Sequence, residues 1–338
     1  MSTFVIVGAG MMGSAMTFPA ASNHHDIRLV GTPYDRAVID QLRASHVHPA
    51  LKTELPASVQ PFQFEELDQA LQDADLLISG VPSFGTDWFA QNVLTRIPDS
   101  LVTLSLTKGL HDLPDGTLLP ISQAYLIHPA LQGRHLTICS IGGPCISHEL
   151  CRGLHTTVAL VGENRVLLQA LADQLATHYY HIQPMTDVIG LESAIAMKNA
   201  YAVGVALAIG IAEAAGSPVQ DNPQAALFGQ SMREMMRLIA LLGGSPESVV
   251  FAASDLYVTI VGGRNRQLGI LLGKGLSLAQ ALEQLKGVTL ESISIITHAA
   301  RAIRRRHDAT INDFPLLRHL DEIVSQNAPL NIPWHEFH

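Results

Sequence analysis

A short apolar run followed directly by a glycine-rich turn opens the chain. Residues 4–7 read FVIV, and the turn that follows reads GAGMMG at 8–13. β-Branched and aromatic residues favour a strand, and glycine permits a tight turn from a strand into a helix. A Gly-x-Gly-x-x-Gly pattern in this context predicts the first strand–turn–helix unit of a doubly wound α/β domain.

The same turn predicts a dinucleotide site. Gly8 permits the turn, Gly10 lets backbone N–H groups approach a pyrophosphate, and Gly13 lets the helix pack closely on the strand. The N-terminus of the following helix favours negative charge. We therefore expect the turn, with Met11 and Met12, to contact the cofactor. A glycine-rich turn without a ligand is the alternative.

Strand-like and helical segments alternate through the first half of the chain. Runs rich in apolar and β-branched residues predict strands at 4–7, 27–30, 76–81, 101–106, 136–141, 157–161 and 179–183. Helical patterns at 34–44 and 65–72 lie between some of them. Continuous apolar runs are typical of a parallel sheet covered by helices on both faces. The sequence thus predicts an N-terminal Rossmann-type doubly wound sheet.

The pattern changes close to residue 187. From residue 191 onward the sequence predicts only helices, the first of them over 191–215. We expect two domains, a dinucleotide-binding Rossmann domain at 1–187 and an all-helical substrate-binding domain at 188–338.

The second helix of this later half carries start and stop signals. Asn222 is expected to cap its N-terminus, and Pro223 suits the first turn. Gly243 and Gly244 are expected to end it.

Composition argues against several classes of protein. The 338 residues include 21 basic and 30 acidic side chains, for a net charge of -9. A protein that coats nucleic acid needs clustered positive charge, so we expect no nucleic-acid partner. The uncharged run at 200–212 is too short to span a bilayer, so we expect no membrane insertion. Cys139, Cys145 and Cys151 form no CxxC pair, which favours a reducing, cytoplasmic setting.

Histidines are numerous, but their spacing does not indicate a metal site. The sequence contains 16 histidines and no H-E-x-x-H motif. His24, His25, His46 and His48 occupy polar, turn-like stretches. We expect these side chains to be solvated, and we expect no bound metal.

A lysine interrupts the first apolar helix of the later half. Small apolar side chains fill most positions between 187 and 210, as in a helix that is buried on all sides, yet Lys198 lies in the middle. A buried ammonium needs a partner, or its pKa falls toward neutrality. Such an amine can exchange a proton with a carbonyl or alcohol oxygen. A catalytic role and a structural ion pair with Glu192 or another acid both stay open at this point.

Polar groups follow two predicted strands of the first half. Lys108 comes at the end of the run 101–106, and the segment GGPC at 142–145 follows the next strand. Ligands of open α/β sheets bind at the carboxyl ends of the strands. Lys108 and the backbone of this glycine segment are therefore candidates for ligand contacts.

A third candidate segment lies late in the helical half. Gly262 and Gly263 precede Arg264 and Asn265, and Asp255 lies upstream. Free backbone N–H groups beside a guanidinium suit an anion such as a phosphate. The start of a helix with a surface arginine is the simpler alternative.

Together these segments resemble the NAD(P)-dependent glycerol-3-phosphate dehydrogenases over nearly the whole chain. The matching motifs are GAGMMGSA at 8–15, VPS at 81–83, SLTKGL at 105–110, GGP at 142–144, DVIGLESAIAMKNAYAVG at 187–204, NPQAAL at 222–227 and GGRNRQLG at 262–269. Their order and spacing are more specific than one glycine-rich turn. The resemblance implies hydride transfer between NAD or NADP and the pair dihydroxyacetone phosphate and sn-glycerol 3-phosphate.

The resemblance also implies roles for individual residues. Lys198 would donate and accept the proton, Asp255 would orient it, and Lys108 would contact both substrate and cofactor. The substrate-binding set would be Lys108, Gly143, Cys145, Asn199, Thr259, Arg264 and Asn265. The cofactor-binding set would be Gly8, Gly10, Met11, Met12, Gly13, Pro82, Lys108, Ser147 and Arg264.

Substrate and cofactor preference stay open in the sequence. An acid usually follows the second strand of NAD enzymes and an arginine that of NADP enzymes, but here Asp35 and Arg36 are adjacent and come a few residues late. Cys145, Ser147 and Lys286 depart from residues that are common in the family. A related polyol or keto-sugar phosphate as substrate, and a non-enzymatic dinucleotide-binding sensor, are the alternatives. A homodimer is also expected.

Overall fold

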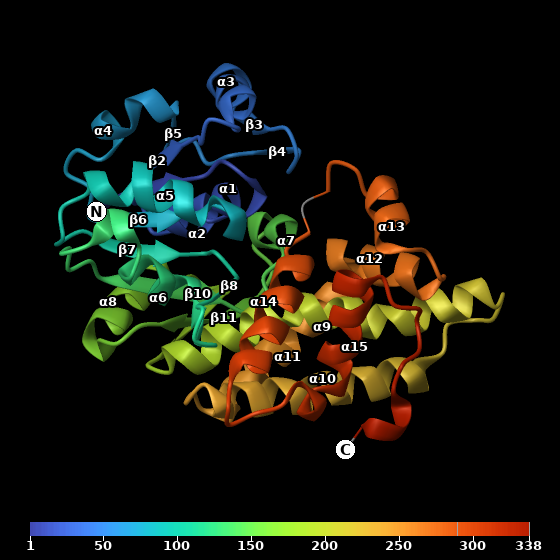
Figure 1. Ribbon diagram of the computed structural model, residues 1–338. Coiled ribbons are helices and arrows are strands. Elements are labelled where there is room, and N and C mark those ends of the chain that lie inside the picture. Colours follow the sequence, from blue (N-terminus) through green and yellow to red (C-terminus); the bar gives the residue numbers. More distant parts are fainter. Residues whose placement is uncertain (289, 338) are drawn as a thin grey trace. The chain divides into compact units, whose positions relative to one another are not determined.

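The computed structural model describes residues 1–288 and 290–337, and the chain forms two compact units (Figure 1). The first comprises Met1–Lys108 and Ile121–Val188, and the second Gly109–Pro120 and Ile189–His338. The change of unit near residue 188 lies beside the predicted boundary. The segment Gly109–Pro120 differs from the prediction, which placed it in the first domain.

A mixed eight-stranded sheet forms the centre of the first unit, in the order β12-β11-β10-β7-β6-β1-β2-β5. Its strands are β1 Thr3–Val7, β2 Asp26–Val30, β5 Val59–Phe62, β6 Leu76–Ser79, β7 Val102–Ser105, β10 Ile138–Gly142, β11 Thr156–Val161 and β12 Tyr180–Met185. All neighbours are parallel except β10 and β11. The predicted Rossmann-type sheet is confirmed, and one antiparallel pair lies beside its parallel strands.

The seven predicted strands are present in this sheet, and its one further strand, β5, escaped the prediction. Its sequence is VQPF, with Pro61 in the middle. Proline cannot donate a ladder hydrogen bond and is tolerated at the edge of a sheet, which is where β5 lies. A strand of this kind lacks the apolar run that marks a central one.

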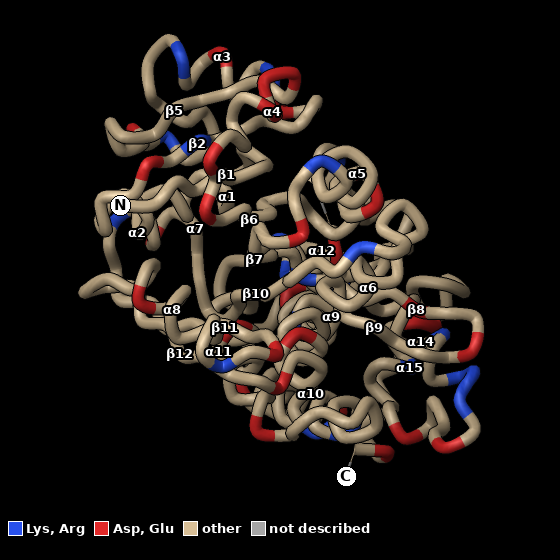
Figure 2. Tube along the Cα trace, turned by 90° about the vertical axis from the view of Figure 1, so that its left-hand side faces the viewer, with Lys and Arg blue, Asp and Glu red and all other residues tan. Residues whose placement is uncertain are grey.

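Helices cover both faces of this sheet. They are α1 Met11–Ala15, α2 Thr17–Ser22, α3 Arg36–Ser45, α4 Leu67–Ala70, α5 Thr86–Asn92, α6 Ile121–Leu126, α7 Ser147–Cys151 and α8 Arg165–Leu175. Phe4 and Ile6 belong to one buried cluster, whereas Val5 and Val7 belong to another. Alternate residues of β1 therefore pack on opposite faces. Figure 2 shows the central strands β1, β6, β7 and β10 without acidic or basic residues.

Two details of the predictions for the first unit need correction, one a helix and the other a pair of short strands. The predicted helix at 65–72 is a 3₁₀ turn, Phe64–Glu66, followed by the short helix α4. A small hairpin of β3 Val47–His48 and β4 Thr53–Glu54 follows α3. The sequence indicated only turns there.

Over its described residues, the second unit is helical apart from one hairpin. Its helices are α9 Val188–Ala214, α10 Asp221–Leu241, α11 Val249–Gly262, α12 Arg264–Gly273, α13 Leu278–Gln284, α14 Ser292–Arg305 and α15 Pro315–Gln326. The hairpin consists of β8 Leu110–Asp112 and β9 Leu118–Pro120. It packs on α14, which explains why this segment belongs to the helical unit.

The predicted cap of α10 is wrong. The N-cap residue is Gln220 rather than Asn222, and its side chain makes no capping hydrogen bond. Pro223 does lie in the first turn, and the helix ends at Leu241, just before Gly243. Proline tolerates several positions in the first turn, so it locates the start of a helix only approximately.

The long helix α9 forms the core of the helical unit (Figure 1). Every residue from 190 to 210 is buried, as the sequence predicted. It is the one helix among residues 1–288 and 290–337 that is long and apolar enough to cross a membrane, yet 94% of its most apolar window is buried. Its apolar composition is therefore that of a core helix.

Glycines let α9 and α12 approach each other at backbone distance. A Cβ atom on Gly273 would lie 2.9 Å from the Cα of Gly210 and would overlap the carbonyl oxygen of Leu207. A Cβ atom on Gly269 would overlap the carbonyl oxygen of Val203. The spacing of Gly269 and Gly273 places both on one face of α12, so this contact sets how the C-terminal half of α12 lies against α9.

Candidate functional site

The glycine-rich turn contains two glycines that the protein itself requires. Gly8 has φ +111°, and a Cβ atom there would lie 2.8 Å from the carbonyl carbon of Gly80. A Cβ atom on Gly13 would overlap the carbonyl oxygen of Gly8. These two positions therefore accept only glycine on steric grounds.

Gly10 is different, because nothing in the protein forces it to be glycine. Its φ is -70°, and no atom lies within 4 Å of a Cβ atom built there. It precedes α1, whose first residue, Met11, is exposed. The open space beside Gly10 fits the close approach of a pyrophosphate to the turn.

The other predicted residues of the first unit lie at the carboxyl ends of neighbouring parallel strands. The strands β1, β6, β7 and β10 are adjacent and parallel in that order. The glycine-rich turn follows β1, Pro82 follows β6, Lys108 follows β7, and Gly143 follows β10. Four predicted segments that are distant in sequence thus share one edge of the sheet, as expected for a ligand site of an open α/β fold.

Lys108 and Gly143 are in direct contact at this edge. The Nζ atom of Lys108 donates a hydrogen bond to the carbonyl oxygen of Gly143 at 3.3 Å. Gly143 has φ +142°, and a Cβ atom there would lie 3.2 Å from the Cα of Val158. Glycine is therefore needed to bring this carbonyl group to the lysine.

Cys145 and Ser147 follow the same glycine segment. Cys145 is half-buried and is not in a disulfide, and Ser147 is the buried first residue of α7. Cys151 is the third cysteine of the chain, and burial raises the pKa of its thiol to about 11. A thiol with such a pKa is protonated at neutral pH and is a poor nucleophile.

In the second unit, Lys198 is a buried amine with two oxygen partners. Only 8% of the residue is exposed. Its Nζ atom donates to Asp255 Oδ1 at 3.0 Å and to Thr259 Oγ1 at 2.8 Å. The predicted burial of Lys198 is confirmed, and an acid from α11 provides the ion pair that the sequence left open between Glu192 and other residues.

The spacing of Asp255 and Thr259 explains why both reach the same amine. They are four residues apart on α11, so their side chains lie on one face of the helix. The Thr259 hydroxyl donates to the backbone carbonyl of Asp255 at 2.7 Å, which leaves its oxygen free to accept from Lys198. The two hydrogen bonds therefore fix the direction of the amine.

A chain of amide and carboxylate groups continues from the next residue of α9. Asn265 Nδ2 donates to Asn199 Oδ1 at 3.0 Å, and Asn199 Nδ2 donates to Glu291 Oε2 at 3.4 Å. The Oδ1 atom of Asn265 is buried and makes no hydrogen bond to any residue that the structure describes. An acceptor in this state costs free energy unless a ligand group satisfies it. Glu291 was not predicted, because no sequence motif marks it.

Of the two glycines before Arg264, Gly263 has a packing role and Gly262 does not. A Cβ atom on Gly263 would lie 2.6 Å from the carbonyl oxygen of Thr259, whereas one on Gly262 would meet open space. Gly263 thus lets α12 begin against the end of α11. Arg264 is the exposed first residue of α12, and Asn265 beside it is buried.

Sequence reasoning missed two residues that hold the glycine-rich turn. Asp35 Oδ2 accepts from the backbone N–H of Ala9 at 3.1 Å, and His48 Nε2 lies 2.9 Å from the carbonyl oxygen of Ala9. The expectation that His48 and His25 are solvated is wrong, because both are buried, whereas His24 is exposed. Polar neighbours in sequence did not reveal these tertiary contacts.

Arg36, the candidate NADP residue, forms an exposed ion pair with Glu65. Asp35 also accepts from the backbone N–H of Thr32 at 2.8 Å and from its hydroxyl at 2.7 Å. Both side chains therefore have protein partners, and neither decides between the two dinucleotides.

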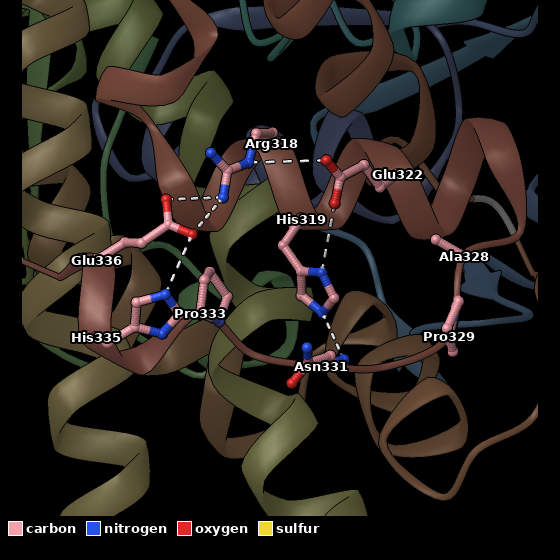
Figure 3. Close-up of a pocket in the computed structure, with 9 residues that line it drawn as sticks. All are labelled: Arg318, His319, Glu322, Ala328, Pro329, Asn331, Pro333, His335 and Glu336. Atoms are coloured by element: carbon pink, nitrogen blue, oxygen red, sulfur yellow. Dashed lines mark hydrogen bonds and ion pairs between the residues drawn. The ribbon is translucent and has the colours of Figure 1, made fainter.

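A pocket of about 290 Å³ lies elsewhere in the helical unit, beside α15 and the C-terminal segment (Figure 3). Several of the polar groups that line it form hydrogen bonds with one another. Arg318 donates to both carboxylate oxygens of Glu336 at 2.7 and 2.8 Å, and the N–H of Asn331 donates to His319 Nε2 at 3.2 Å. None of its lining residues was predicted for the site.

Within the described part of the chain, no three His, Cys, Asp or Glu side chains are grouped to hold a metal ion.

Two family models match successive parts of the chain. The family model described as NAD-dependent glycerol-3-phosphate dehydrogenase N-terminus matches residues 3–167, and that described as its C-terminus matches residues 187–333. An NADP(+)-dependent glycerol-3-phosphate dehydrogenase of Archaeoglobus fulgidus is 31% identical over 283 residues, 83% of this chain and 83% of that protein. A glycerol-3-phosphate dehydrogenase (NAD(P)+) of Bacillus pumilus is 32% identical over 301 residues, 87% of this chain and 82% of that protein.

A solved structure supports the fold over both units. The crystal structure of a glycerol-3-phosphate dehydrogenase from Coxiella burnetii superposes with a TM-score of 0.81 at 22% identity. The match covers 99% of this chain and 97% of that one. The chain belongs to the NAD-dependent glycerol-3-phosphate dehydrogenase family.

Proposed function

We propose that this protein interconverts dihydroxyacetone phosphate and sn-glycerol 3-phosphate, with NAD or NADP as the cofactor. The observation that carries the proposal is the buried Lys198 amine, held by Asp255 and Thr259. A protein that only binds a dinucleotide does not need such an amine. Membership of the dehydrogenase family supports the same reaction.

The first unit is proposed to bind the dinucleotide. The glycine-rich turn would receive the pyrophosphate beside Gly10, where the structure leaves space. Met11, Met12, Pro82 and Ser147 would line the same site. When bound, the nicotinamide supplies or takes up the hydride.

The second unit is proposed to supply the acid and the phosphate contacts. During reduction of the ketone, Lys198 would protonate the developing alkoxide, while Asp255 and Thr259 keep its amine in place. The first unit would contribute Lys108, which would stabilise negative charge on the substrate, near the backbone of Gly143 and Cys145. The guanidinium of Arg264 would bind the phosphate.

Two amides would complete this substrate site. Asn265 would add a polar contact to the phosphate. Asn199 holds Asn265 in place through the 3.0 Å hydrogen bond between them. Both side chains would thus present their polar atoms to the substrate in a fixed orientation.

A steady-state panel tests the reaction. The purified protein would be assayed for oxidation of NADH and of NADPH with dihydroxyacetone phosphate, unphosphorylated dihydroxyacetone and larger keto-sugar phosphates. We expect the highest kcat/KM with dihydroxyacetone phosphate. A higher value with a larger keto-sugar phosphate would favour the related dehydrogenase, and dinucleotide binding without turnover of any substrate would favour a sensor.

We also propose that the enzyme is cytoplasmic. Cys139, Cys145 and Cys151 are not in disulfides, which suits a reducing cytoplasm. We further propose a homodimer, which multi-angle light scattering would test directly.

A further inference from the structure

Both polar atoms of the Ala9 backbone are held by side chains from outside the glycine-rich turn. The N–H group of Ala9 donates to Asp35 Oδ2, and the carbonyl oxygen of Ala9 is 2.9 Å from His48 Nε2. Ala9 lies between Gly8, which has a positive φ, and Gly10, which lies beside open space. The orientation of its peptide groups therefore affects where the turn presents its N–H groups.

The contacts of His48 determine which of its two ring nitrogens carries the hydrogen. The backbone N–H groups of Ala50 and Leu51 donate to Nδ1 at 3.2 and 3.1 Å, so Nδ1 carries no proton. The hydrogen is then on Nε2, which donates to the Ala9 carbonyl. Because His48 is only 1% exposed, water cannot replace this contact.

The contacts of Asp35 fix its carboxylate against the turn. Three donors converge on Oδ2, namely the N–H of Ala9 and the N–H and hydroxyl of Thr32. Thr32 follows β2, and the N–H of Gly8 donates to Val30, the last residue of β2, at 2.8 Å. The carboxylate thus ties the segment after β2 to the segment after β1.

We propose that Asp35 and His48 are positioning residues that hold the Ala9 peptide, and with it the glycine-rich turn, in the conformation that binds the dinucleotide pyrophosphate. This role does not depend on the ribose 2′ position. The two side chains should therefore support binding of NAD and of NADP to the same degree. This inference rests on the proposed dinucleotide site.

Dinucleotide affinity of matched variants tests the proposal. Titration with NADH and with NADPH, followed by nicotinamide fluorescence, would give Kd for the wild type and for Asp35→Asn, Asp35→Ala, His48→Ala and His48→Gln. Loss of a hydrogen bond to a charged or buried group predicts about a 10-fold rise in Kd for the alanine variants. His48→Gln keeps an N–H donor near the Nε2 position and should remain within about 3-fold of the wild type.

His25 provides a matched control in the same unit. It is also buried, its Nδ1 accepts from the N–H of Ser2 at 3.3 Å, and its Nε2 lies 2.9 Å from the carbonyl of Gln174. It therefore makes the same type of backbone contacts without touching the turn. His25→Ala should lower Tm but leave both dinucleotide Kd values unchanged.

The outcomes separate positioning from other roles. Equal rises in Kd for the two cofactors, with the control unchanged, support the proposal. A rise confined to NADH in the Asp35 variants would make Asp35 a reader of the ribose and overturn it, as would an equal rise in His25→Ala. If His48→Ala does not fold, Asp35→Ala decides, and an unchanged Kd for both cofactors overturns the proposal.

Assays of the wild type distinguish a failure of the proposed reaction from a failure of this inference. Tight dinucleotide binding without turnover of dihydroxyacetone phosphate would refute the reaction but leave this test valid. In the variants, the KM for dihydroxyacetone phosphate at saturating cofactor should stay near the wild-type value. A general loss of structure would change that KM as well.

Discussion

The amine of Lys198 lies 3.0 Å from the carboxylate of Asp255, and the two residues are only 8% and 2% exposed. The two groups are 57 positions apart in sequence and come from different helices, α9 and α11. Each charge of a buried ion pair stabilises the other, because either charge alone would be poorly solvated in the protein interior. The orientation of the amine is therefore set by contacts within the protein rather than by water.

Replacing Lys198 should affect turnover more than binding. Lys198→Ala is expected to lower kcat by about 10²–10⁴-fold, the usual contribution of a positioned acid or base. Steady-state assays of dihydroxyacetone phosphate reduction would measure it. Lys286→Ala is the control, because Lys286 is a surface lysine whose side chain is 82% exposed. Wild-type kcat in Lys198→Ala would remove this residue from proton transfer.

Removing the acid partner should cost stability. Asp255→Ala leaves a buried ammonium without its carboxylate, and about 3–5 kcal/mol of unfolding free energy should be lost. Urea denaturation would measure the loss. The double variant Lys198→Met with Asp255→Ala should recover part of it, since no charge stays buried. No recovery in the double variant would argue against the unpaired charge as the cause.

Arg264 should act on the phosphorylated substrate alone. Arg264→Ala is expected to raise KM for dihydroxyacetone phosphate by about 10-fold or more, because a phosphate loses its charge-assisted hydrogen bonds. The KM for unphosphorylated dihydroxyacetone, measured at high concentration, should change little. An equal change for both ketones would be inconsistent with a phosphate contact.

The β8–β9 hairpin should loosen from α14 in acid. Burial opposes ionisation of Asp112, but hydrogen bonds from Arg301 and His298 outweigh it and lower its pKa from 3.8 to about 2. A lowered folded-state pKa stabilises the protein above the unfolded value, and this stabilisation is lost as the pH falls from about 4 toward 2. The stability difference between the wild type and Asp112→Asn should therefore shrink over this range in thermal unfolding. A constant difference would contradict the assignment.

The contact between α9 and α12 should not tolerate a methyl group. In Gly273→Ala, the new Cβ atom would overlap the carbonyl oxygen of Leu207, so the helices must separate and stability should fall by about 1–3 kcal/mol. Gly229→Ala is the control, because a Cβ atom there meets only the end of Arg233 at 3.7 Å. Alanine favours the helix at that half-buried position by about 1 kcal/mol, so Tm should rise. Equal effects in the two variants would contradict the packing argument.

The amino-acid sequence determined those features that depend on neighbouring residues. The FVIV run with its glycine-rich turn predicted the first βα unit, because a turn at φ +111° needs glycine at position 8. The apolar residues around Lys198 predicted its burial, because every face of α9 is apolar. Local pattern carries this information directly.

Only the tertiary structure decided which groups meet. It selected Asp255 and Thr259 as partners of Lys198, assigned residues 109–120 to the helical unit, and buried His48 against the Ala9 carbonyl. Each of these depends on packing between segments distant in the chain. A side chain in a polar stretch has the same local sequence whether it faces water or a backbone carbonyl, so its partner becomes known only when the fold brings the two together.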